Sequence, residues 1–127
     1  MKPTSDLTTL TRSQKLQLLE LFSEWGGVSW VVPADPKDVM SRLVSCGVEC
    51  NLDYERETLV FLGAHAQLSQ AVWGGFEIRL NLLLDILIDK SGLSLKSINP
   101  SPGVFTHVER LKQLAMHWGL DHQLDWV

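Results

Sequence analysis

Carboxylates are concentrated in one short segment near the middle of the chain. They are Glu49, Asp53, Glu55 and Glu57. Arg56 is the only basic residue among them, and residues 48–54 alternate apolar and polar side chains as a half-buried strand does. A polar turn and the apolar run 58–62 follow, which predicts a β-hairpin over 48–62. Such a hairpin would gather negative charge on its outward face and at its tip.

Two interpretations of this acidic segment are open. Charged side chains protect an exposed strand from pairing with another chain, and that is the simpler explanation. Alternatively, the segment is a docking surface for a basic protein, because complementary charge accelerates association. The second interpretation predicts a function, whereas the first concerns solubility alone.

A second set of carboxylates follows helical spacing. Glu77, Asn81, Asp85 and Asp89 are each four residues apart in an otherwise apolar segment. Facing a pocket, such a stripe would carry raised pKa values and suit a small-molecule binder or an enzyme. More simply, it is the solvent-facing side of a packed helix. Residues 76–82 also alternate as a strand would, so helix and strand are both open over 76–90, and the residue types favour the helix.

The cysteines and histidines offer only weak metal sites. Cys46 and Cys50 with His65 lack the second ligand pair that a structural zinc site ordinarily uses, so we expect two small buried side chains. A polar cluster near the C-terminus is a further candidate for metal binding or acid–base chemistry. It contains His117, Asp121, His122 and Asp125. A histidine at a helix end is also favoured by the helix dipole, which is the simpler explanation of His117. We expect neither a metal nor a cofactor in this chain.

Composition narrows the class of protein. A chain of 127 residues that is 45% hydrophobic and 20% charged fits one globular domain, 1–127. The net charge of −4 and the scattered basic residues argue against nucleic acid or an anionic membrane as the partner. The apolar stretch 76–88 is too short and too charged to span a bilayer. With no secretory signal visible, the two thiols indicate a cytoplasmic protein.

Start and stop signals outline the helices. Thr11 and Gln14 form a capping box, which opens a helix that Gly26-Gly27 would end. Asp35-Pro36 opens a second helix, and Gly47 would end it. Thr106 and Glu109 form another capping box, and Gly119 would close the helix that follows.

The remaining segments complete the predicted fold. We expect a short strand at 28–32 and a short helix from Ala64 to Trp73. The prediction is therefore an α+β, helix-rich fold, with about four to five helices around a small antiparallel sheet that contains the 48–62 hairpin.

The absence of catalytic motifs and the presence of tryptophan both bear on function. No nucleophile–base motif, phosphate loop or metalloprotease motif occurs, which favours binding over catalysis. Tryptophan is frequent at binding hot spots, and Trp30 is a candidate for exposure. We expect a small acidic cytoplasmic module, an inhibitor or immunity-type protein that occludes a basic protein partner. Its partner-binding residues would be Glu49, Asp53, Glu55, Glu57 and Trp30.

Two other hypotheses stay open. The chain would be a small-molecule-binding domain or an enzyme if the stripe of Glu77, Asp85 and Asp89 faced a pocket. It would be a homodimeric scaffold if the apolar segment 76–88 were buried between two subunits.

Overall fold

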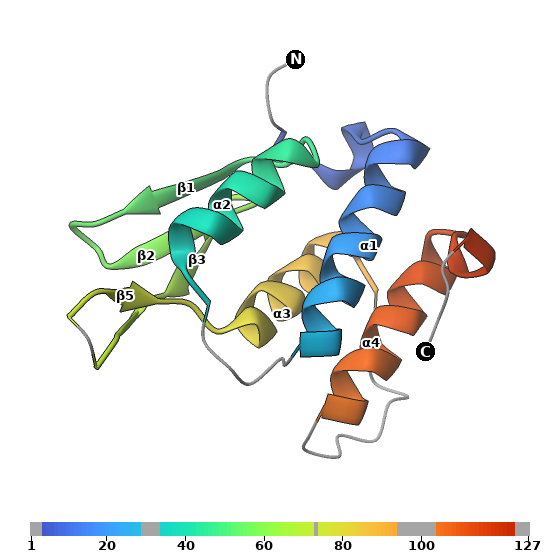
Figure 1. Cartoon of the computed structure of the whole chain (residues 1–127). Coiled ribbons are helices and arrows are strands. Elements are labelled where there is room, and N and C mark those ends of the chain that lie inside the picture. Colours follow the sequence, from blue (N-terminus) through green and yellow to red (C-terminus); the bar gives the residue numbers. More distant parts are fainter. Residues whose placement is uncertain (1–3, 29–33, 73, 94–103, 124–127) are drawn as a thin grey trace.

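The chain forms an α+β fold of four α-helices and two small antiparallel sheets within the residues that the structure describes. The computed structural model describes residues 4–28, 34–72, 74–93 and 104–123 (Figure 1). The helices are α1 (Arg12–Val28), α2 (Pro36–Ser45), α3 (Leu80–Ser91) and α4 (Val104–His117), with short 3-10 turns η1 (Leu7–Thr9) and η2 (Asp121–Gln123). The strands are β1 (Cys50–Asp53), β2 (Thr58–Phe61), β3 (Ala64–Gln67), β4 (Ser69–Gln70) and β5 (Phe76–Glu77).

Helix α1 begins at the predicted capping box. The Thr11 amide donates to the Gln14 side chain at 2.9 Å, and the Gln14 amide donates to the Thr11 hydroxyl at 3.1 Å. The predicted stop at Gly26-Gly27 is wrong, because α1 continues to Val28. Glycine weakens a helix but does not end it, and the buried side chains of Phe22 and Trp25 stabilise the preceding turn. The strand expected at 28–32 lies outside the described residues, apart from Val28.

Helix α2 begins and ends where its signals predicted. The Asp35 carboxylate accepts the Lys37 amide at 3.0 Å, and Pro36 is the first helical residue. Gly47, at φ +91°, ends the helix in a Schellman motif: its amide donates to the Val44 carbonyl at 2.9 Å. This tight stop directs the chain straight into the predicted hairpin.

The hairpin over 48–62 is present as β1 and β2. Cys50 pairs with Phe61, and Asp53 pairs with Thr58 at the turn end. Strand β3 adds to the other side of β2, so the sheet order is β1-β2-β3. The helix predicted from Ala64 to Trp73 is therefore wrong over the described residues, which form β3 and β4. Hydrogen bonding to β2 outweighs the weak strand propensity of Ala, His and Gln in this segment.

The ambiguous segment 76–90 contains both kinds of structure. Phe76 and Glu77 form β5, which pairs with β4, and α3 begins only at Leu80. The predicted helix is thus correct from Leu80 onward and wrong for the four residues before it. Gly92, at φ +79°, follows its last turn.

Helix α4 begins earlier than predicted. It starts at Val104, so Thr106 lies inside the first turn and is not the capping residue. Its end agrees with the prediction: Gly119 has φ +70°, and the Leu120 amide donates to the Ala115 carbonyl at 2.8 Å. Both Leu120 and Ala115 are buried, and an apolar contact between these positions often accompanies the Schellman motif.

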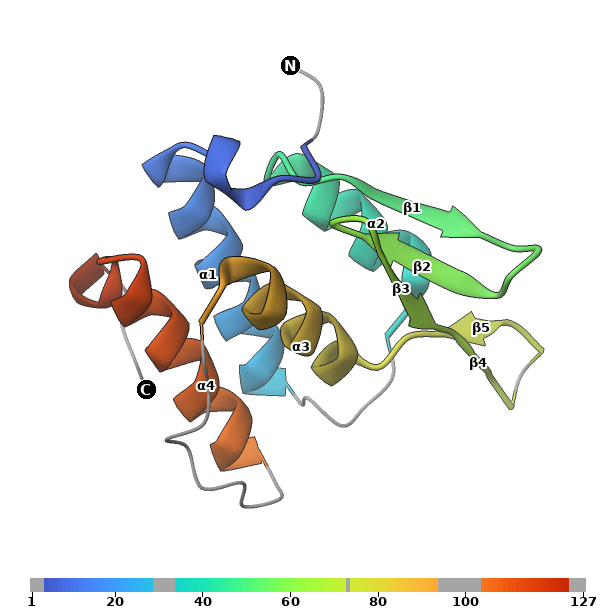
Figure 2. The same cartoon turned by 180° about the vertical axis from the view of Figure 1, so that it is seen from behind.

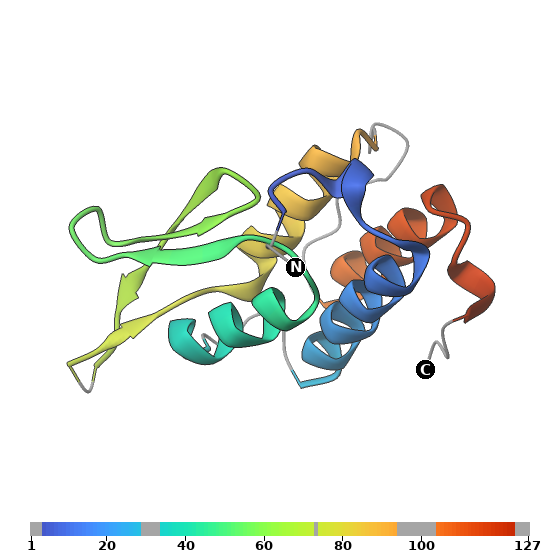
Figure 3. The same ribbon diagram turned by 90° about the horizontal axis from the view of Figure 1, so that it is seen from above.

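The sheets lie at one end of the molecule and helices α1 and α4 at the other, with α2 and α3 between them (Figures 1 and 3). Helix α2 lies in front of the sheet in Figure 1 and behind it in Figure 2, so it covers one sheet face only. Phe22 of α1 stacks on Phe61 of β2 with ring centroids 6.4 Å apart, which ties the helical end to the sheet.

Helix α3 lies at the centre of this core. Its buried side chains are Leu80, Leu83, Leu84, Leu87 and Ile88. The apolar side chains of segment 76–88, which suggested a homodimeric scaffold, are therefore largely buried within the chain. Across the described ranges, every helix is too short or too polar to traverse a lipid bilayer.

Candidate functional site

The register of the three-stranded sheet separates an apolar face from a polar one. Cys50 and Leu52 of β1 lie opposite Phe61 and Leu59 of β2, and these four side chains form the face toward α2 and the core. The intervening positions project from the other face. They are Asn51 and Asp53 of β1, Thr58 and Val60 of β2, and His65 and Gln67 of β3. Glu49 precedes β1 in the same alternation.

The four predicted carboxylates are distributed along this hairpin. Glu49 lies at the base, where its amide donates to the Thr4 carbonyl at 2.7 Å. Asp53 ends β1, and Glu55 and Glu57 are exposed in the turn. The structure thus places Glu49 and Asp53 on the outward face and the other two at the tip. Trp30, the fifth predicted partner-binding residue, lies outside the described residues.

The hairpin tip is well anchored and acidic. Arg56 forms an ion pair with Asp53 at 3.8 Å, and its amide donates to the same carboxylate at 3.2 Å. Because the Arg56 side chain is 73% exposed, water screens this pair and it stabilises the fold little. The Glu57 carbonyl accepts from the Leu68 amide at 2.9 Å and from the Gln67 side chain at 3.1 Å. The tip therefore presents two carboxylates from a fixed backbone.

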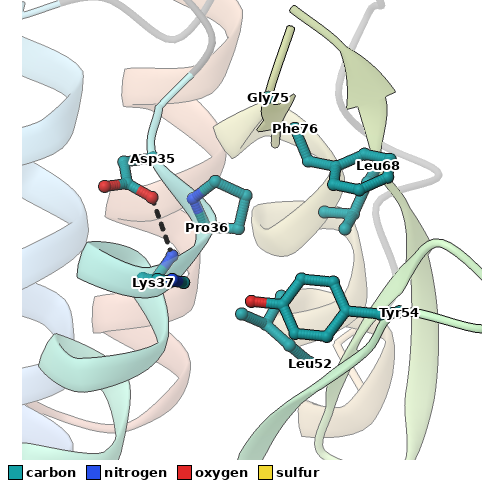
Figure 4. Close-up of a pocket in the computed structure, with 8 residues that line it drawn as sticks. All are labelled: Asp35, Pro36, Lys37, Leu52, Tyr54, Leu68, Gly75 and Phe76. Atoms are coloured by element: carbon teal, nitrogen blue, oxygen red, sulfur yellow. Dashed lines mark hydrogen bonds between the residues drawn. The ribbon is translucent and has the colours of Figure 1, made fainter.

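A pocket of about 570 Å³ opens beside this tip, on the face of the sheet toward α2. Figure 4 shows residues of α2 on one side, facing Phe76 and Leu68, with Tyr54 and Leu52 of the hairpin adjacent. The lining residues are Asp35, Pro36, Lys37, Leu52, Tyr54, Leu68, Gly75 and Phe76. Its volume is within the range of about 300–1,000 Å³ typical of ligand sites.

The pocket has an apolar interior and a polar rim. Pro36 and Leu68 are buried, and Leu52 is half-buried. The rings of Tyr54 and Phe76 lie 6.3 Å apart and are inclined at 47°. Asp35 and Lys37 are exposed at the first turn of α2. This arrangement can hold an apolar group and contact charge of either sign at its mouth.

Sequence reasoning missed this pocket for an identifiable reason. Leu52 and Tyr54 occupy the apolar positions of the hairpin, which the alternation shows. The opposite wall comes from Leu68 and Phe76, in segments that were predicted to be helical. Ala64, Ala66 and Leu68 alternate with polar residues, and this period of two is the signal that indicates a strand there.

The carboxylate stripe does not converge on any pocket described here. Glu77 belongs to β5 and pairs with Ser69, whereas Asp85 and Asp89 lie on α3. Asp85 forms an ion pair with Arg110 of α4, whose side chain is only 16% exposed. None of the three carboxylates lines the pocket beside the hairpin. The stripe therefore takes no part in the pocket beside the hairpin.

The two cysteines are buried and free, as expected of small apolar side chains. Burial raises the pKa of the Cys50 thiol to about 12, and burial followed by the charge of Glu20 raises that of Cys46. His65 is exposed on the outer face, with its Nδ1 atom 3.2 Å from the Thr58 hydroxyl. Among the described residues, no three potential ligands gather closely enough to hold a metal ion.

The polar residues near the C-terminus have separate partners. The His117 ring nitrogen lies 3.2 Å from the Ser91 carbonyl at the end of α3, and His122 lies 3.5 Å from Asp121. Asp125 lies outside the described residues. The part of this cluster that the structure describes is therefore not a converging site.

Comparisons of the chain with protein-family models, with curated proteins and with solved structures found no match. The hairpin and the adjoining pocket are therefore the features of this chain that bear on its function.

Proposed function

We propose that this chain is a small acidic protein-binding module that docks a basic protein through its hairpin. Its action would be that of an inhibitor or immunity-type protein, which neutralises the partner by covering a functional surface. The observation that carries the proposal is the strand register, which directs Asp53 outward and leaves Glu55 and Glu57 exposed at the tip.

The charge balance of the hairpin supports a cationic partner. Its carboxylates number four over residues 49–57, and Arg56 supplies the only positive charge in that interval. A basic surface approaching the tip would meet a net negative charge, which raises the association rate at low salt. Edge protection requires charge along the strand, but it gives no reason for further carboxylates in the turn.

The proposed setting is the cytoplasm, where a module of this kind would meet an intracellular basic protein. Occlusion requires no cofactor and no catalytic group. The chain would act stoichiometrically, so its effect on the partner should saturate at a fixed molar ratio.

Affinity capture from a cell lysate followed by mass spectrometry tests the proposal. The tagged chain should recover a basic protein, and recovery should fall between about 0.1 M and about 1 M salt, as the Debye length shrinks from about 10 Å to about 3 Å. Reversing all four hairpin carboxylates to lysine should abolish recovery.

A matched pair of variants separates this surface from net charge. Glu55→Lys/Glu57→Lys and Glu20→Lys/Asp89→Lys change the net charge equally, and all four residues are exposed. Only the hairpin variant should lose the partner. Equal losses from both variants, or no basic partner even at low salt, would count against the proposed function.

A further inference from the structure

The acidic tip and the apolar pocket meet at one residue, Tyr54. Its ring lines the pocket, and it begins the turn that carries Glu55 and Glu57. Tyr54 is 53% exposed, and it is the one large exposed hydrophobic residue among those described that lines the pocket. A partner that contacts the tip would therefore reach the pocket mouth as well.

We propose that the pocket receives one aromatic side chain from a basic segment of the partner, whose flanking lysines or arginines contact the hairpin tip. This inference rests on the proposed function and specifies the chemistry of the partner. The occupant would be a side chain projecting from a cationic peptide segment.

The shape and lining of the pocket favour an aromatic occupant. Tyr54 and Phe76 are 6.3 Å apart at an inclined angle, so a third ring can pack edge-to-face or offset against either of them. Pro36, Leu52 and Leu68 supply the remaining apolar contacts. Aromatic side chains that fill such desolvated pockets are the usual hot spots of protein interfaces.

The surroundings of the pocket favour positive charge beside that ring. Glu55 and Glu57 follow Tyr54 at the tip, and Asp35 lies at the opposite rim. Lys37 and Arg56 are the nearby cations, and Arg56 is already paired with Asp53. The exposed Tyr54 ring can also receive a lysine or arginine through a cation–π contact.

The four hairpin carboxylates should contribute unequally to binding of such a segment. Leu52 lies on the inner face of the sheet and lines the pocket together with Tyr54, whereas the alternation along the strand places Glu49 on the outer face. Glu49 also precedes Asp53 by four residues, a separation of about 13 Å along a strand at roughly 3.3 Å per residue. That distance exceeds the Debye length of about 8 Å at physiological salt. Glu55 should therefore contribute more than Glu49 to binding of such a segment.

Peptide titration of the full chain, followed by amide chemical shifts in NMR spectra, tests the inference. The probe is the blocked peptide Lys-Lys-Trp-Lys-Lys, compared with the same peptide carrying Ala for Trp and with one carrying Gln for each Lys. The lysine–tryptophan peptide should shift the amides of Leu52, Tyr54, Leu68 and Phe76. Each of the other two should bind about tenfold more weakly.

Variants of the chain locate the binding to the pocket and the tip. Tyr54→Ala and Glu55→Lys should each weaken the lysine–tryptophan peptide about tenfold, and Tyr54→Phe should retain most of the affinity. Met116→Ala, an equally exposed apolar position on α4, is the control and should change nothing. Glu49→Lys should have a smaller effect than Glu55→Lys.

The outcomes distinguish this inference from the proposed function. If Glu55→Lys abolishes binding while Tyr54→Ala does not, the pocket inference fails and the acidic docking surface stands. If the glutamine peptide binds as tightly as the lysine peptide, the inference is overturned, and the pocket is better explained as a site for uncharged small molecules. No amide shift with any peptide also overturns it, whereas the lysate capture decides the proposed function separately.

Discussion

Asp85 of α3 forms an ion pair with Arg110 of α4, and this contact joins two helices that the chain connects only through residues 92–103. The Arg110 side chain is 16% exposed, whereas the Asp85 side chain is 52% exposed. A largely buried guanidinium depends on its carboxylate partner, because removing one member of such a pair leaves a charge poorly solvated. Asp85 therefore has a structural role in joining the two helices.

Replacing Asp85 with asparagine should lower the free energy of unfolding by about 1–2 kcal/mol, a value discounted for the exposure of the carboxylate. Asp89→Asn is the matched control, since Asp89 is exposed one turn further along α3, and it should change stability by less than about 0.5 kcal/mol. Urea denaturation of both variants measures the difference. Equal stabilities would show that the interhelical pair contributes nothing.

A side chain at Gly47 should destabilise the fold. Its φ is +91°, and a Cβ atom there would lie 2.5 Å from the side-chain nitrogen Nε2 of Gln14. The side-chain oxygen Oε1 of the same residue accepts the backbone amide of Thr11 in the α1 cap. Gly47→Ala should therefore cost about 2–3 kcal/mol, from left-handed strain of about 1–2 kcal/mol and a disturbed cap of about 1 kcal/mol.

Gly92→Ala separates these two effects. Gly92 has φ +79°, but no atom lies within 4 Å of its added Cβ, so only the backbone strain applies. Thermal denaturation should show Gly47→Ala to be the more damaging. In a Gln14→Ala background the extra cost of Gly47→Ala should disappear, because the contact it disturbs is then absent.

Local signals predicted several element boundaries correctly where the residues that decide the structure are neighbours in sequence. The Thr11–Gln14 capping box, the Asp35 cap and the Gly47 stop each depend on side chains within a few positions, and all three are present. The 48–62 hairpin follows the same logic, since one turn brings its two strands together.

Two local signals were wrong, the Gly26-Gly27 stop and the Thr106–Glu109 cap, and the larger errors fall where distant segments decide the structure. Ala64–Gln67 is a strand because β2 supplies its hydrogen-bonding partners, and Phe76 is extended because β4 does. Both segments alternate apolar and polar residues as strands do, but no local feature identifies the strand with which each will pair. The same limit hid the pocket, because its two walls come from segments that meet only after both pairings form. The outward face of the hairpin could be predicted, but its apolar neighbour could not.

His107 should make stability depend on pH. Burial lowers its pKa below the ordinary 6.5, the Arg110 cation lowers it further, and Asp85 opposes the shift. The ring is therefore protonated at a higher pH in the unfolded chain than in the folded chain. Stability contributed by the neutral ring is fully present above pH 6.5 and declines as the pH falls from there toward the folded-state pKa.

The measurement is the free energy of unfolding across this pH interval. His107→Gln should give a shallower decline below pH 6.5 than the unmodified chain, because the remaining titrating groups are common to both. Asp85→Asn should steepen the decline, since it removes the carboxylate that favours the protonated ring. Parallel curves for the unmodified chain and His107→Gln would contradict the prediction.

Replacing Glu57 with asparagine should stabilise the fold. It adopts φ +54°, a left-handed conformation that disfavours most side chains and that asparagine tolerates. Its carbonyl keeps the backbone there by accepting from Leu68 and Gln67, and its side chain is exposed, so little packing is at risk. Glu57→Asn should therefore raise the free energy of unfolding by up to about 1 kcal/mol.

Glu55→Asn is the matched control, because it removes the same charge from the same turn without a left-handed backbone. Equal stability of the two variants in urea denaturation would show that no strain is relieved at Glu57. If the tip binds a basic partner, both variants should weaken that binding while only Glu57→Asn gains stability, because binding depends on the carboxylate and stability on the backbone conformation.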